Sequence, residues 1–130
     1  MNPVTRALLK QISDQQLEKF AEDWDNLEAL VVEIYKQKSL SFEQQEDFFQ
    51  LQEGLQERYA SLREELGLFW PKTKVRGEPV TADPFAALIA KRAAQEFVGN
   101  WDAMRTLPAA REALNLMLMA RIEKRKSLNK

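Results

Sequence analysis

The sequence predicts an all-α fold: an antiparallel four-helix bundle with a short N-terminal helix and a long connection between main helices 2 and 3. Two observations carry this prediction. Apolar residues recur at spacings of three and four along most of the chain, which is the period of an amphipathic helix. Only four glycines and five prolines interrupt the 130 residues. A chain of this length fits a single domain, residues 1–130, with a sizeable core.

Each expected helix after the first has a recognisable start signal. Ser13 and Ser41 each precede a glutamine by three residues. This is the pattern of a capping box, in which the serine hydroxyl and the glutamine amide satisfy free backbone N–H groups. Asp83 followed by proline is a second kind of start, and Pro108 ends the preceding segment and opens the last helix. The expected helices cover residues 4–12, 14–38, 41–67, 84–104 and 108–126.

The apolar positions indicate which face of each helix is buried. Those of 14–38 and of 41–67 step by three and four, so the two segments are expected to form a helical hairpin. Gly54 lies inside the second helix, where it costs about 1 kcal/mol relative to alanine unless a neighbouring helix needs close approach. The apolar positions are Leu17, Phe20, Trp24, Leu27, Val31 and Ile34 in the first helix, and Phe48, Leu51, Leu55, Tyr59, Leu62 and Leu66 in the second.

Residues 68–83 break the helical pattern. Gly77, Pro79 and Trp70-Pro71 leave no room for a helix, so this stretch is expected to be an irregular connection. Connections of this length are uncommon in compact domains and are often functional. Two interpretations stay open, a crossing from one end of the bundle to the other and a binding loop, and the crossing is favoured.

The last helix is apolar on almost every side between residues 113 and 120. Such a helix is buried on several sides. Either it is central in the monomer, or one of its faces is kept for a second chain. The candidate self-association surface consists of Leu116, Met119, Leu118 and Ile122.

Charge is divided unevenly along the chain. Residues 1–70 hold seven Lys or Arg against fourteen Asp or Glu, net −7, and residues 71–130 hold twelve against six, net +6. The acidic helices could lie against basic ones within the chain, two copies could associate, or the basic half could bind an anionic partner. The candidate anion-binding residues are Lys72, Lys74, Arg76, Lys124, Arg125 and Lys126.

Enzymatic and metal-dependent functions have little support in the sequence. It contains neither cysteine nor histidine, so the commonest general base, the thiol nucleophile and the commonest transition-metal ligand are all missing. No phosphate-binding loop, dinucleotide-binding glycine pattern or nucleophile elbow occurs. We therefore expect a non-enzyme with no cofactor and no metal, whose many carboxylates form a solvated face.

Three functions stay open. The leading hypothesis is a non-catalytic protein–protein interaction or adaptor protein that forms a homodimer. The alternative is a nucleic-acid-associated regulator that uses the basic 72–76 loop and the C-terminal tail, which ranks lower because the pI is about 5.6. The third is a protein that binds a small apolar ligand in its core. We expect a cytoplasmic location, because no stretch approaches a membrane span and the N-terminus lacks a signal-peptide pattern.

Overall fold

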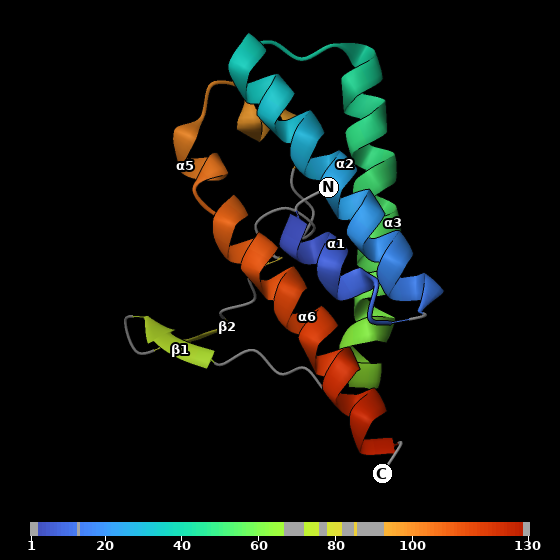
Figure 1. Cartoon of the computed structure of the whole chain (residues 1–130). Helices are drawn as coiled ribbons and strands as arrows, with labels where there is room; N and C mark the ends of the chain where they lie inside the picture. Colours follow the sequence, from blue (N-terminus) through green and yellow to red (C-terminus); the bar gives the residue numbers. More distant parts are fainter. Residues whose placement is uncertain are drawn as a thin grey trace.

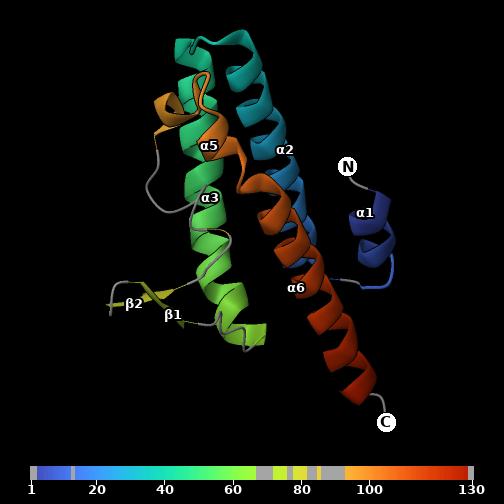
Figure 2. The same cartoon turned by 90° about the vertical axis from the view of Figure 1, so that its left-hand side faces the viewer.

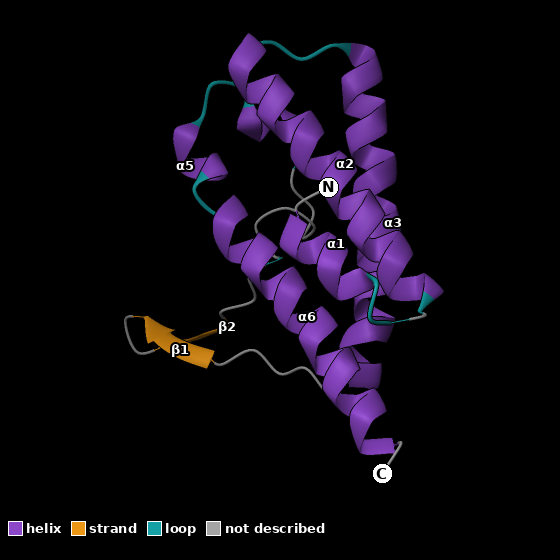
Figure 3. Ribbon diagram, viewed as in Figure 1, coloured by secondary structure: helices purple, strands orange, loops and turns teal. Residues whose placement is uncertain are grey.

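The computed structural model describes residues 3–12, 14–66, 72–75, 78–81, 85 and 93–128. These residues are mostly helical, as expected (Figures 1 and 3). The finer expectation, an antiparallel four-helix bundle, stays a prediction, since residues 86–92 of the expected fourth helix lie outside the described residues. The elements are α1 (Pro3–Leu9), α2 (Gln15–Gln37), α3 (Phe42–Leu66), β1 (Lys72–Val75), β2 (Glu78–Thr81), the 3-10 helix η1 (Ala94–Phe97), α5 (Trp101–Met104) and α6 (Leu107–Leu128).

The two longest helices, α2 and α3, form a hairpin in which they run side by side in opposite directions (Figures 1 and 2). The capping box predicted at Ser41 is present: the Gln44 backbone N–H donates to Ser41 Oγ, and the Ser41 N–H donates to Gln44 Oε1, both at 3.1 Å. Lys38 ends α2 in the left-handed conformation, with φ 55°. These two signals close the hairpin within four residues.

The start of α2 differs from the prediction. The N-cap is Asp14, not Ser13, because one carboxylate oxygen of Asp14 accepts from the backbone N–H groups of Gln16 at 3.0 Å and of Leu17 at 3.2 Å. A carboxylate is a stronger acceptor than a hydroxyl, and its charge is favourable at the positive end of the helix dipole. Ser13 itself lies outside the described residues.

The expected irregular connection 68–83 contains a small hairpin. β1 and β2 pair antiparallel, with Lys72 opposite Thr81 and Val75 opposite Glu78. The β-branched residues Thr73, Val75, Val80 and Thr81 favour extended backbone, which explains why this stretch is not irregular throughout. The hairpin lies to one side of the helices (Figures 1 and 2). The other residues of the connection are outside the described part of the chain.

The expected helix 84–104 is not continuous. Phe85 lies in a turn, η1 ends at Phe97, and a turn through Gly99 separates η1 from the single-turn helix α5. Gly99 has a φ of +60°, which only glycine adopts without strain. Asn100 then caps α5 by accepting from the backbone N–H of Asp102 at 3.1 Å. The Gly-Asn pair therefore stops one helix and starts another, and it overrides the apolar periodicity on either side.

The core lies where α6 packs against α1, α2 and α3. Leu114, Met117 and Leu118 of α6 are fully buried. Phe85 reaches an aromatic cluster, with ring centroids 5.7 Å from Phe20 and 4.9 Å from Tyr59. Trp24 packs edge-on to Phe85 at 5.3 Å. Other large, fully buried side chains are Leu17, Leu27, Ile34, Leu55, Leu62 and Phe97.

Candidate functional site

The residues proposed for self-association divide between core and surface. Leu118 is fully buried and Ile122 is 9% exposed, whereas Leu116 and Met119 are each 49% exposed. Leu118 and Ile122 follow Leu114 at spacings of four, so all three lie on the core side of α6. Leu118 and Ile122 are therefore core residues and are removed from the candidate surface, which keeps Leu116 and Met119.

The outer face of α6 has a regular pattern. Glu112, Leu116, Met119 and Glu123 follow one another at steps of four, three and four, and all four are exposed. These spacings place them along one line of the helix. We call these four residues the α6 stripe: a central apolar pair with a glutamate at each end.

A second exposed apolar pair lies on α3 and was missed at the sequence level. Phe42 is 76% exposed, the largest value among the exposed large hydrophobic side chains, and Phe49 is 62% exposed. Their separation of seven residues, or two helical turns, places them on one line, together with Glu46 and Glu53. We call Phe42, Glu46, Phe49 and Glu53 the α3 face. The sequence does contain a signal for this pair: Phe42 and Phe49 are seven residues apart, as are the buried Phe48 and Leu55, but they lie on a different side of the helix.

The candidate anion-binding residues lie on two separate segments. Lys72 and Lys74 belong to β1, while Lys124, Arg125 and Lys126 belong to the C-terminal part of α6 (Figure 1). Arg76 is outside the described residues. The ammonium group of Lys124 donates to the backbone carbonyl of Glu65 at 2.9 Å, so this lysine helps hold α6 to the end of α3.

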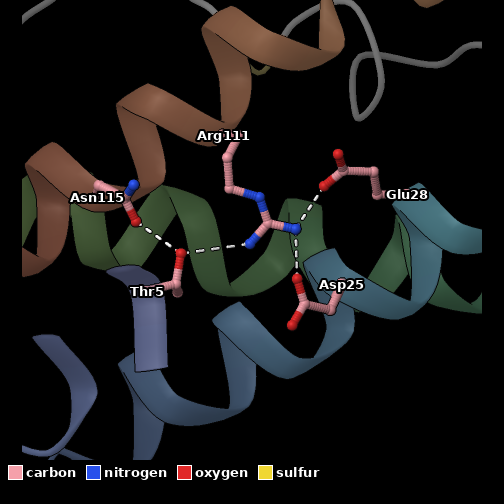
Figure 4. Close-up of polar contacts among 5 residues, drawn as sticks. All are labelled: Thr5, Asp25, Glu28, Arg111 and Asn115. Atoms are coloured by element: carbon pink, nitrogen blue, oxygen red, sulfur yellow. Dashed lines mark hydrogen bonds and ion pairs between the residues drawn. The ribbon is translucent and has the colours of Figure 1, made fainter. Parts of the chain in front are cut away.

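A cluster of polar side chains joins α1, α2 and α6 around Arg111 (Figure 4). The Arg111 guanidinium donates to the carboxylates of Asp25 and Glu28 on α2. It also reaches Thr5 Oγ1 at 3.5 Å, and that hydroxyl donates to Asn115 Oδ1 at 2.7 Å. The side chains of Arg111, Asp25 and Glu28 are only 15%, 17% and 25% exposed. This Arg111 cluster therefore fastens three helices by charge-assisted hydrogen bonds.

Ionic contacts of α6 continue toward its C-terminal end. Arg121 lies between two carboxylates, with Nε 3.0 Å from Asp14 Oδ2 and Nη1 3.0 Å from Glu65 Oε1. The Nε–Oδ2 contact is an ion pair by distance but is not aligned for a hydrogen bond. Basic residues of α6 thus neutralise acidic residues of α2 and α3. The structure therefore shows one of the three interpretations of the uneven charge, in which basic residues of the second half pair with acidic residues of the first half within the chain.

The ionic contacts of Arg111 and Arg121 hold helices together. A guanidinium stays protonated in proteins and accepts no hydrogen bond, so Arg111 offers no general base. Among the described residues, no group of three or more acidic side chains is arranged to hold a metal ion. The aromatic residues of the core fill it by packing against one another, although Trp24 Nε1 has no acceptor in the described part of the chain.

No helix in the described residues is both long and apolar enough to cross a membrane. The described surface carries two exposed apolar pairs, Leu116 with Met119 on α6 and Phe42 with Phe49 on α3. The Arg111 cluster holds α6 against α1 and α2. Comparisons with models of known protein families, with curated proteins and with solved structures found no match.

Proposed function

We propose that the chain is a non-catalytic protein–protein interaction protein that self-associates through the α6 stripe. The supporting observation is that α6 is apolar on two sides. Leu114 and Leu118 fill the core, while Leu116 and Met119 remain about half exposed on the other side of the helix. A helix that only covered a core would carry polar side chains there. Adjacent exposed apolar side chains that the core does not use are typical of a contact surface.

The two glutamates of the α6 stripe determine how the strength of the dimer depends on salt. In an antiparallel contact about a twofold axis between Leu116 and Met119, each Glu112 faces Glu123 of the second copy. Like charges in such positions oppose association. Because salt screens exposed charges, the dimer is expected to be weak at low ionic strength and stronger at high ionic strength.

Light scattering coupled to size-exclusion chromatography tests the proposal at tens of micromolar protein. We expect a dimer in 0.5 M salt for the natural sequence and a monomer for Leu116→Gln/Met119→Gln. Val4→Gln is the matched control, since Val4 is 58% exposed on α1 and lies outside the stripe. Glu112→Gln/Glu123→Gln should strengthen the dimer at low salt. A monomer for the natural sequence under all these conditions would overturn the self-association.

A further inference from the structure

The α3 face presents two bulky aromatic side chains at a fixed spacing. Phe42 and Phe49 are exposed by 76% and 62% and lie seven residues apart on one helix. A rise of 1.5 Å per residue separates them by about 10 Å along the axis. This is the distance between successive equivalent positions of a second helix that runs alongside.

A cavity lies beside Phe49. It has a volume of about 520 Å³ and opens between α3 and the segment Ala93–Gln95. Leu40, Phe48 and Phe49 provide its apolar lining, and Gln45, Gln52 and Gln56 provide amide groups. The volume is within the range of sites that accept several side chains or a small molecule. Phe49 belongs to both the exposed face and the cavity, so the two form one continuous surface.

The charge of α3 determines which partners this surface favours. The helix carries seven Asp or Glu against two Arg, net −5. Glu46 and Glu53 alternate with the two phenylalanines, and neither has an ion-pair partner within the part of the chain that the structure describes. A phosphate-bearing partner, such as a nucleic acid or an anionic membrane, would be repelled, and so would the same face of a second copy. A cationic partner would be attracted.

We propose that the α3 face and its cavity dock an amphipathic helix of a partner protein, one that presents bulky apolar residues along one side and Lys or Arg beside them. The apolar residues contact Phe42 and Phe49 and enter the cavity, as in other helix-in-groove complexes. The basic residues pair with Glu46 and Glu53. The α3 face shares no residue with the α6 stripe, so the proposal does not require self-association.

Synthetic peptides of about 20 residues, long enough to form a helix on binding, provide the probe. One carries leucines at heptad spacing with lysines beside them, a second replaces these lysines with glutamates, and a third keeps the composition of the first but scrambles the order. Fluorescence anisotropy of labelled peptide is followed while the full-length protein is added. The natural sequence should bind the lysine peptide and bind the other two at least tenfold more weakly.

Two variants locate the contact. Phe42→Ser/Phe49→Ser should weaken binding of the lysine peptide by at least about tenfold, the loss typical when anchoring aromatic contacts are removed. Glu46→Lys/Glu53→Lys should reverse the preference, so that the glutamate peptide binds more tightly than the lysine peptide. Leu116→Gln/Met119→Gln is the control and should bind as the natural sequence does, which separates this proposal from self-association.

Several results would overturn the proposal. The lysine peptide could fail to bind at millimolar concentration, or the ordered and scrambled peptides could bind equally well. The third such result is that Glu46→Lys/Glu53→Lys still prefers the lysine peptide over the glutamate peptide. Circular dichroism of each variant shows whether its helices are retained. If Phe42→Ser/Phe49→Ser instead abolishes dimerisation of the protein, a second copy of this chain occupies the α3 face. The proposal of a basic amphipathic helix from another protein would then be wrong.

Discussion

Arg111 on α6 forms an ion pair with Asp25 on α2, and 86 residues of sequence separate the two. The same guanidinium pairs with Glu28, and both carboxylates are largely shielded from water. Charges in such a position are stabilising only while they are paired, because removal of one partner leaves the others desolvated. The Arg111 cluster is therefore the point at which a single substitution should loosen the packing of three helices.

We expect Arg111→Met to lower the free energy of unfolding by about 2–4 kcal/mol, since two partly buried carboxylates lose their cation. Urea unfolding followed by circular dichroism measures the change. Arg105→Met is the matched control: Arg105 pairs with Asp102 at 3.2 Å, but their side chains are 67% and 83% exposed. Such an exposed pair contributes less than about 1 kcal/mol. Equal losses in the two variants would show that the Arg111 cluster does not fasten the helices.

A charge-neutralised background sharpens this test. In Asp25→Asn/Glu28→Gln, neutral amides replace the two carboxylates and need no cation. Arg111→Met should therefore lower the free energy of unfolding clearly less in this background than in the natural sequence. The difference is the coupling energy of a double-mutant cycle and isolates the ionic contribution from the packing of the arginine side chain. Full additivity would mean that the loss in Arg111→Met comes from packing alone.

The sequence predicts the long helices because their signals are local. The apolar steps of 14–38 and 41–67 and the capping box at Ser41 need no knowledge of distant residues, and α2 and α3 lie within a residue or two of the expected bounds. The Arg111 cluster is the opposite case. Thr5 and Asn115 are 110 residues apart, so their hydrogen bond follows only from the way α1 packs on α6.

The break within the expected helix 84–104 shows a different limit. The positions Phe97, Trp101 and Met104 have helical spacing, yet Gly99 turns the chain between them. Phe97 is fully buried beside Phe48, while Trp101 is 63% exposed and packs against Tyr35. Apolar spacing alone therefore does not distinguish one continuous helix from two short ones. The glycine and the asparagine after it were the missed signal.

The N-cap of α2 gives a prediction that distinguishes two neighbouring residues. Asp14→Ala should lower the free energy of unfolding by about 1–2 kcal/mol, because two backbone N–H groups lose their acceptor and Arg121 loses a partner. Asp14→Asn keeps the acceptor and loses only the ion pair, so it should cost less. Thermal unfolding at neutral pH measures both. Ser13→Ala should have little effect, and a larger loss there than in Asp14→Ala would restore serine as the cap.

Gly99 provides a test of backbone strain. Its φ of +60° disfavours any side chain, although a Cβ there would meet only Lys38 Cγ, at 3.9 Å. We expect Gly99→Ala to lower the free energy of unfolding by about 1–2 kcal/mol through the backbone alone. Gly99→Asn should cost less, since asparagine tolerates the left-handed conformation better than alanine does. If the two variants were equally stable in urea, backbone strain at Gly99 would not explain the break between η1 and α5.

Gly54 is the opposite case, a glycine with ordinary helical backbone inside α3. A Cβ at this position would lie 3.3 Å from Arg58 Nη1 and 3.8 Å from Asp23 Oδ2, and that arginine and aspartate form an ion pair at 2.6 Å. Alanine favours the helix by about 1 kcal/mol over glycine. In the natural sequence, part of this gain is offset because Arg58 must shift away from Asp23.

We therefore expect Gly54→Ala to stabilise the protein by about 1 kcal/mol in an Arg58→Ala background and by clearly less in the natural sequence. Urea unfolding of the four proteins in the cycle measures the difference. The side chain of Asp23 is only 9% exposed and also pairs with Lys19 at 3.2 Å. We therefore expect its charge to keep one partner when Arg58 is replaced. An equal gain in both backgrounds would show that Arg58 adjusts freely and that glycine is not required for the Asp23–Arg58 contact.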